Sequence, residues 1–223
     1  MINTALKGDK TRFSFLIDRE ILRFLKGVTS YVQGRLLDVG CGDKPYYEIF
    51  KDYCKEYIGI DISPSRKSTV EVIARATRLP FKDETFETVL STQVLEHIPE
   101  PEEMIREVYR VLKKGGTFIL TLPQYWRLHE IPHDYFRFTR YGIEYLLKKV
   151  SFKILKIETM GGAWSLIGQS ILSHLASPYG SYGFFRPFRN LIKIFLNTIF
   201  SCLDRRFPDR EDTMGYMLLA RKE

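Results

Sequence analysis

The sequence predicts an α/β protein with a doubly wound sheet, and two observations support this prediction. Short apolar runs with the length of buried strands alternate with amphipathic runs of helical period over residues 35–122. The first apolar run, residues 36–39, passes directly into a turn that contains Gly40 and Gly42. Strands that alternate with helices at this spacing imply a mostly parallel sheet with helices on both faces.

Seven strands are expected in this sheet, and the last of them is expected to be antiparallel. They are residues 36–39, 57–61, 70–73, 86–91, 117–122, 152–159 and 213–221. Glycine is the residue that tolerates unusual backbone angles and close approach to a ligand. The glycine turn after the first strand is therefore a candidate cradle for a cofactor, at the carboxyl end of that strand.

The helices are expected between the strands and before the last one. The predicted ranges are 13–32, 45–54, 101–112 and 140–150. Pro45 suits the first turn of a helix, and Thr139 suits an N-cap. Lys113 and Lys114 complement the helix dipole, and Gly115 with Gly116 is expected to end the third helix.

Length and composition fit one ordinary globular domain of 223 residues. The formal charge of +7 favours an anionic partner without selecting a nucleic acid, a small acid or a lipid surface. Cys41, Cys54 and Cys202 are scattered and form no C-x-x-C pattern, so we assign no metal site and expect a reducing, cytoplasmic location. Residues 1–12 lack a signal pattern, and no apolar run is long enough to predict a transmembrane helix.

The order strand, glycine turn, helix, strand and acid is typical of nucleotide-type cofactor sites. The acid is Asp61, 19 residues after Gly42, and such an acid accepts hydrogen bonds from ribose hydroxyls. Pro45 stands where a dinucleotide motif has its third glycine. The sequence therefore argues against NAD.

Several further motifs follow in a fixed order. They are Asp38-Val39-Gly40-Cys41-Gly42, Gly59-Ile60-Asp61, Leu79-Pro80-Phe81, Val94-Leu95-Glu96-His97-Ile98, and Leu112-x-x-Gly115-Gly116. This set closely resembles the class I S-adenosylmethionine-dependent methyltransferases, in particular the small-molecule branch of the type 11 kind. The resemblance covers residues 35–123 motif by motif and implies a Rossmann-like fold, with S-adenosylmethionine as cofactor and S-adenosylhomocysteine as product.

The resemblance also implies roles for single residues. Those expected at the amino-acid end of the cofactor are Asp38, Gly40, Cys41 and Gly42, and those at its ribose and adenine are Asp61 and Ile62. The residues expected to face its methionine part are Gln93 and Val94. The family commonly places an adenine-reading aspartate where this chain has Arg75, so the backbone of Ala76 and Thr77 is expected to contact the adenine instead.

Residues 124–140 form a candidate substrate loop that is rich in aromatic residues and histidines. Methyl transfer to oxygen or nitrogen can need a general base, and the loop offers the candidate catalytic residues His133, Asp134, Tyr135 and Arg137, besides His129. The segment 133–139 resembles one in methyltransferases of sugar and cell-envelope biosynthesis. Two alternatives stay open: a structural role for His133, fixed by Asp134 or by backbone, and pairing of Arg137 with Glu130 rather than with an anionic group of the substrate.

Residues 163–212 are expected to form a helical insertion before the last strand. Its apolar stripe at helical spacing comprises Phe188, Leu191, Ile192, Phe195, Leu196, Ile199, Phe200 and Leu203, after Pro187 at the helix start. The stripe belongs either to a lid packed over the site or to a peripheral membrane contact, because Arg186, Arg189, Lys193, Arg205 and Arg206 accompany it. A nucleic-acid partner is not expected, because the positive charge is spread along the chain.

Taken together, residues 1–223 are interpreted as a single methyltransferase domain with an N-terminal helical cover at 1–34. We expect transfer of a methyl group to an oxygen or nitrogen of a small molecule, with a sugar or a lipid-linked envelope intermediate as the finer hypothesis. The alternative is a protein that keeps the fold and the cofactor site but has no activity. The sequence does not predict the oligomeric state.

Overall fold

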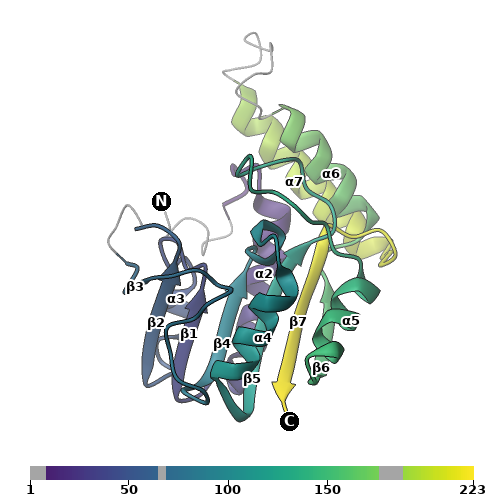
Figure 1. Cartoon of the computed structure of the whole chain (residues 1–223). Helices are drawn as coiled ribbons and strands as arrows, with labels where there is room; N and C mark the ends of the chain where they lie inside the picture. The colour runs from purple at the N-terminus through teal and green to yellow at the C-terminus, as the bar shows by residue number, and fades with distance from the viewer. Residues whose placement is uncertain (1–8, 65–68, 176–187) are drawn as a thin grey trace.

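A seven-stranded sheet with helices on both faces forms the body of the protein in the computed structural model, which describes residues 9–64, 69–175 and 188–223 (Figure 1). The strands are β1 (Arg35–Val39), β2 (Glu56–Asp61), β3 (Val72–Ile73), β4 (Phe86–Thr92), β5 (Leu112–Pro123), β6 (Phe152–Thr159) and β7 (Gly215–Lys222). Their order in the sheet is β3-β2-β1-β4-β5-β7-β6. The predicted α/β class is confirmed.

The strand order reverses beside β1, which pairs in parallel with β2 on one side and with β4 on the other. Strand β7 lies between β5 and β6 and is antiparallel to both, as the sequence predicted for the last strand. In doubly wound sheets the crevice at such a reversal, outside the carboxyl ends of the strands, is the usual place for a ligand.

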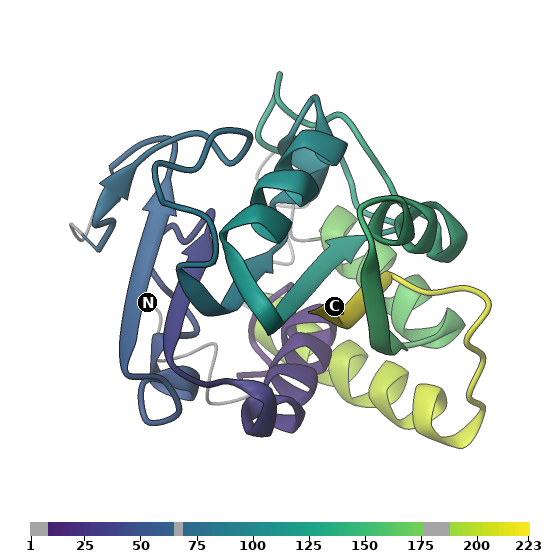
Figure 2. The ribbon, with the colours of Figure 1, turned by 60° about the horizontal axis from the view of Figure 1, so that its bottom comes forward.

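The sheet buries both faces, and neighbouring residues of one strand point into different cores. Leu37 belongs to the core under α4 (Pro101–Val111) and α5 (Arg140–Lys149), whereas Leu36 belongs to the core under α2 (Phe15–Gly27). Figure 2 shows α2 and α7 (Arg189–Arg206) on one side of the sheet, with α4 and α5 on the other. Thr139 caps α5, since its hydroxyl accepts from the Gly142 amide at 3.1 Å.

Several predicted boundaries were wrong. The helix expected at 45–54 is a single turn, α3 (Tyr47–Phe50), and the first helix ends at Gly27 before a short 3-10 turn, η1 (Thr29–Tyr31). Helix α4 ends at Val111, and β5 begins at the next residue. Gly115 and Gly116 therefore lie in an irregular part of β5, where the register with β4 shifts between Phe86 and Thr88, and they do not end the helix.

The helical insertion forms a hairpin of α6 (Ala163–Leu175) and α7 at the end of the sheet where the parallel strands finish (Figure 1). The two helices approach closely, because a Cβ on Gly168 would lie 2.5 Å from Cγ of Phe200. Pro187 and Arg186 lie outside the described residues. Within the described residues, no helix combines the length and the apolar character needed to span a membrane.

The inner face of α7 combines buried polar side chains with part of the predicted apolar stripe. Asn197 is buried and donates its side-chain amide to the carbonyls of Lys10 and Arg12 at 2.7 and 3.1 Å. Because the polar side chains face inward, Leu191 and Phe195 are 63% and 62% exposed. Of the predicted stripe, Phe200 is buried, and the half-buried Leu196 and Leu203 pack against the same core.

Candidate functional site

The turn after β1 has the backbone geometry that requires glycine. Gly40 and Gly42 have positive φ values of 73° and 47°, in the left-handed region that residues with a Cβ rarely adopt. The amides of Gly40 and Cys41 both donate to the Ile60 carbonyl at 2.9 Å. These bonds hold the turn against the end of β2.

The loop after β4 packs directly on this turn. A Cβ on Gly40 would lie 2.3 Å from Cγ2 of Val94, so glycine is needed here for close approach as well as for its φ value. Gln93 also has a positive φ, 55°, and is held by its amide and side chain, which donate to the Thr121 carbonyl and hydroxyl. The predicted residues Gly40, Gln93 and Val94 are therefore brought together.

Asp61 lies at the end of β2 with its carboxylate against the glycine turn. Its Oδ2 accepts from the Gly42 amide at 3.0 Å, and its Oδ1 accepts from the Ser63 amide at 3.3 Å. A carboxylate offers about four acceptor sites, so further hydrogen bonds to ligand hydroxyls remain available. Ile62 beside it is 69% exposed and offers an apolar surface next to this acid.

Asp38 is a buried carboxylate at the end of β1. One oxygen accepts from the Tyr57 hydroxyl at 2.7 Å, while Oδ1 is buried and receives no hydrogen bond from the described residues. Burial raises the pKa of Asp38 to about 7, and the Tyr57 hydrogen bond and the Lys44 charge oppose that rise. The Oδ1 atom is an unsatisfied acceptor beside the glycine turn.

Cys41 is placed differently from its neighbours in the turn. Its side chain is 2% exposed and packs against Gly59, where a Cβ would lie 2.6 Å from the sulfur. Burial and the nearby carboxylates raise the pKa of the thiol to about 12. Cys41 therefore contributes to packing between β1 and β2 through its side chain.

Lys44 and Glu71 form an ion pair beside the glycine turn, and neither residue was predicted from the sequence. The Lys44 ammonium pairs with Glu71, and the other oxygen of Glu71 accepts from the Gly59 amide at 2.6 Å. The positive φ of Lys44, 51°, marks the end of the turn in the structure. No residue pattern in the sequence signals an ion pair across 27 positions.

The segment expected at the adenine lies beside the end of β2. The Ala74 amide donates to the Asp61 carbonyl at 2.9 Å, which places Ala76 and Thr77 a few residues beyond that contact. Both are half-buried, whereas Arg75 is exposed. Ala76 and Thr77 therefore follow the Ala74–Asp61 contact closely along the chain. The Arg75 side chain is exposed and does not pack in the core.

Two of the predicted catalytic residues, Asp134 and Arg137, form an ion pair that fixes the loop of residues 124–140. The Arg137 guanidinium donates to both Asp134 oxygens at 2.6 and 2.8 Å and also to the Trp126 carbonyl. The His129 amide donates to the same carboxylate at 3.0 Å. These contacts hold the pKa of Asp134 well below its usual range, so this acid is a poor general base.

The other two, His133 and Tyr135, are exposed on the loop. The His133 ring nitrogen Nδ1 and the Tyr135 hydroxyl are 3.0 Å apart. Asp134 does not hold the His133 side chain, and Arg137 pairs with Asp134 rather than Glu130. His133 and Tyr135 remain accessible to a substrate.

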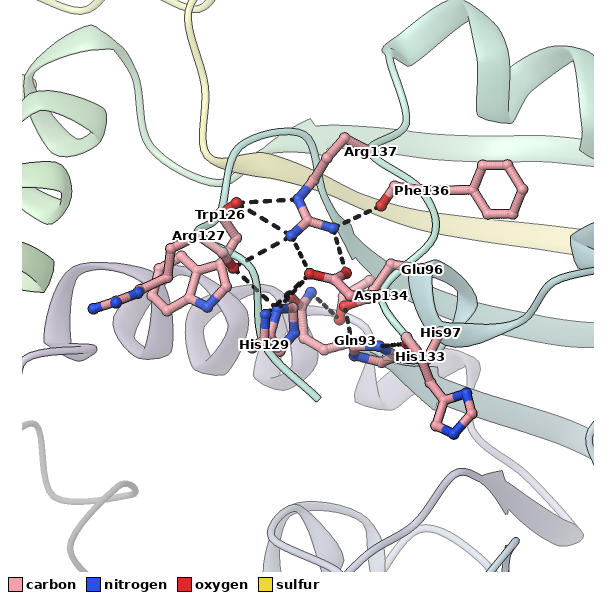
Figure 3. A network of polar contacts seen from close by, with 11 residues as sticks. Gln93, Glu96, His97, Trp126, Arg127, His129, His133, Asp134, Phe136 and Arg137 are labelled. Atoms are coloured by element: carbon pink, nitrogen blue, oxygen red, sulfur yellow. Dashed lines mark hydrogen bonds and ion pairs between the residues drawn. The ribbon is translucent and has the colours of Figure 1, made fainter. Parts of the chain in front are cut away.

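A further cluster joins the loop to the end of β4. It comprises Glu96 and His97 of the 3-10 turn η2 (Leu95–His97) and His129 of the loop, and Figure 3 shows the three side chains near one another beside the Asp134–Arg137 pair. The rings of His97 and His129 are 4.6 Å apart, edge to face. The Glu96 carbonyl accepts from the amides of Tyr135 and Phe136 at 2.9 and 3.2 Å, so the backbone also joins the two segments.

Sequence reasoning assigned no role to Glu96 of this cluster. It is fully buried, and neither carboxylate oxygen accepts a hydrogen bond from another described residue. Burial raises its pKa to about 8. The Leu-Glu-His motif was visible in the sequence, but nothing in it showed that the carboxylate is buried next to His129.

Comparisons with known proteins identify the central part of the chain. The family described as "Methyltransferase domain" matches residues 37–120. An uncharacterized protein of Methanocaldococcus jannaschii is 33% identical over 110 residues, which cover 48% of each chain. Norajmaline N-methyltransferase of Rauvolfia serpentina is 30% identical over 133 residues, which cover 52% of this chain and 45% of that one. The chain thus matches about half the length of these curated relatives.

Solved structures share the fold over most of the chain. An S-adenosylmethionine-dependent methyltransferase from Mesorhizobium loti has a TM-score of 0.58 at 16% identity and matches 91% of this chain and 98% of that chain. The cyclase SpnF has a TM-score of 0.58 at 24% identity, with 90% of this chain and 80% of that chain covered. At these identities the likeness shows the fold and not the reaction.

Residues 37–120 are therefore similar to a methyltransferase domain. Its fold is similar to that of solved S-adenosylmethionine-dependent methyltransferases, the class that its motifs resemble.

Proposed function

We propose that the chain binds S-adenosylmethionine and transfers its methyl group to an oxygen or nitrogen of a small molecule. The observation that supports this most is the set of acceptors around one glycine turn, namely the Asp61 carboxylate and the unsatisfied Oδ1 of Asp38. The Asp61 carboxylate can accept hydrogen bonds from ribose hydroxyls. The buried Asp38 carboxylate can accept a strong, charge-assisted hydrogen bond from a positively charged ammonium group. Gln93 and Val94 close the same turn from the β4 side.

Methyl transfer itself requires few catalytic groups from the protein. The cofactor supplies a sulfonium, which makes its methyl group a good electrophile. The residues of this chain would then orient the acceptor and receive its proton, and these tasks need proximity and a base near neutral pKa. His133 is the exposed histidine of the substrate loop and is proposed for the proton, with Tyr135 beside it at 3.0 Å.

The finer hypothesis for the acceptor is a sugar or a lipid-linked envelope intermediate. Exposed aromatic side chains on the loop, Tyr125 at 46% and Tyr135 at 44%, suit contact with the faces of sugar rings. An amine acceptor is also compatible, since one relative is an N-methyltransferase. Incubating the protein with methyl-labelled S-adenosylmethionine and a panel of sugar, lipid-linked and amine acceptors tests the proposal. Label transfer to one acceptor class supports it, and cofactor binding without transfer to any class would contradict it.

A non-catalytic protein with the same fold is the second candidate. One observation favours it: Arg75 stands in the position where the family reads adenine. The acceptor panel separates the two candidates.

The helical hairpin is proposed as a peripheral contact with an anionic lipid surface, from a cytoplasmic position. Its exposed apolar side chains include Leu191 and Phe195. The accompanying charges on α7 are Arg189, Lys193, Arg205 and Arg206, whereas the single acid, Asp204, is buried and accepts from the amides of Gly162 and Ser165.

The surface of α7 is therefore apolar and purely cationic, which suits anionic lipids. Co-sedimentation with vesicles that contain anionic lipid, but not with neutral vesicles, is the expected result at low salt. Failure to sediment with either kind of vesicle would leave the hairpin as a cover for the site only.

A further inference from the structure

We propose that Glu96, His97 and His129 form a binding site for one divalent transition-metal ion of the zinc type. One potential ligand atom from each residue lies within 4.8 Å of the other two. Zinc binds nitrogen and oxygen ligands at about 2.0–2.2 Å, so ligands of one ion lie about 3–3.5 Å apart. The three side chains therefore need only small shifts to close on a common ion.

The two histidines are held in the tautomer that a metal ligand needs. The Nδ1 atom of His97 lies 2.7 Å from the His133 carbonyl, and that of His129 lies 3.2 Å from the Arg127 carbonyl. A carbonyl can only accept, so each Nδ1 carries the proton and each Nε2 keeps a free lone pair. Metal-binding histidines in proteins are usually oriented by such a contact from the other ring nitrogen.

Asp134 strengthens this arrangement at His129. Its Oδ2 lies 3.3 Å from Nδ1 of His129, and the carboxylate is itself fixed by Arg137. A carboxylate that holds a histidine in this way is a common means of raising the basicity of an imidazole ligand. The role of the Asp134–Arg137 pair is then to position His129 rather than to act on the substrate.

The buried Glu96 carboxylate is the observation that a packing role does not explain. It is fully buried, and no other described residue donates a hydrogen bond to either of its oxygens. Burying a carboxylate without a partner is costly, and the cost rises further when the group is charged. The Arg137 guanidinium is already engaged by Asp134, so a bound cation is the partner that the site lacks among the described residues.

The ligand types select the class of ion. Two imidazoles and one carboxylate suit zinc, cobalt, nickel or iron, whereas magnesium and calcium prefer oxygen ligands alone. Three protein ligands also leave at least one open position, as in zinc sites that act on a bound molecule. Glu96 follows Gln93 and Val94 in the same loop, so the cluster is close in sequence to residues of the proposed cofactor site. Use of the open position for an oxygen of the acceptor rests on the proposed function.

Zinc titration of the chelator-treated full chain by calorimetry tests this site. The expected result is binding of one zinc ion, weakened by at least about tenfold in Glu96→Gln and in His129→Gln. His174→Gln is the matched control, because His174 is exposed on α6 outside the cluster and should leave the affinity unchanged. Addition of cobalt in place of zinc should give a visible absorption band in the wild type that both site variants lose.

Two outcomes would overturn the proposal: no saturable zinc binding at micromolar concentration, or variants that bind as tightly as the wild type. His129→Gln keeps the test decisive if Glu96→Gln does not fold, because the His129 side chain is 30% exposed. Asp61→Ala separates this proposal from the proposed function. It should weaken cofactor binding and leave zinc binding unchanged.

Discussion

Replacing Gly40 by alanine should destabilise the protein by about 2–5 kcal/mol, through two causes that add. The positive φ of 73° at this residue costs a side chain about 1–2 kcal/mol. The added Cβ would also lie 2.3 Å from Cγ2 and 2.8 Å from Cγ1 of Val94, and relief of such an overlap typically costs about 1–3 kcal/mol. The same shift would displace Val94 from the proposed cofactor site.

Two glycines elsewhere serve as controls for the two causes. Gly115 has a φ of 79°, and an added Cβ there would meet no atom within 4 Å, so Gly115→Ala should cost only the conformational strain of about 1–2 kcal/mol. Gly27 is the last residue of α2, has no positive φ, and has no atom within 4 Å of an added Cβ. Gly27→Ala should therefore leave the stability unchanged or raise it by less than about 1 kcal/mol.

Urea unfolding followed by circular dichroism measures the three free energies. The expected order of stability is Gly27→Ala, then Gly115→Ala, then Gly40→Ala. If Gly40→Ala were no less stable than Gly115→Ala, the close contact between the glycine turn and Val94 would be wrong.

Three more predictions concern titration, the substrate loop and the hairpin. Because the pKa of Asp38 is raised from 3.8 to about 7, the folded state keeps a proton that the unfolded chain releases in that interval. The free energy of unfolding of the cofactor-free protein should therefore fall as pH rises from about 4 to about 7, by at most about 4 kcal/mol, and Asp38→Asn should flatten this slope in urea titrations at several pH values. Asp134→Asn should lower stability by about 2 kcal/mol, because it breaks the paired hydrogen bonds from Arg137. It should also speed proteolytic cleavage within residues 124–140. An unchanged cleavage rate would show that the ion pair does not hold the loop. Phe195→Ser should reduce sedimentation with anionic vesicles several-fold. Tyr141→Ser is the control, because Tyr141 lies on α5 and is 78% exposed, and it should not reduce sedimentation. An equal loss in both variants would argue against a specific contact through α7.

The contact between the glycine turn and Asp61 could be predicted from sequence because its parts are local. Gly40, Gly42 and Asp61 each lie at or directly after the end of a strand, and parallel strands bring their carboxyl ends to one edge. The pairing of β1 with β2 then places Asp61 against Gly42 without further information. The same reasoning could not place Lys44 against Glu71, because that contact depends on side-chain packing between distant segments.

The rest of the site could not be predicted because it depends on how the long loop returns to the sheet. Glu96 lies near His129 where the loop returns to the sheet, and the amides of Tyr135 and Phe136 bind the Glu96 carbonyl there. The hairpin shows the same limit. Its apolar stripe left burial and membrane contact both open. The side-chain amide of Asn197 binds the carbonyl of Lys10, and the stripe is divided, with Phe200 buried and Phe195 exposed.

The most direct test of the account is calorimetry of S-adenosylhomocysteine binding to the wild type, Asp61→Ala and Asp52→Ala. Asp61 touches the glycine turn, whereas Asp52 is an exposed carboxylate in the loop before β2. We predict binding by the wild type and by Asp52→Ala, with at least about a tenfold loss in Asp61→Ala, because hydrogen bonds to a charged group contribute about 1.5–3 kcal/mol. No binding by the wild type, or equal affinity in all three proteins, would contradict the assignment of the glycine turn and Asp61 to the cofactor.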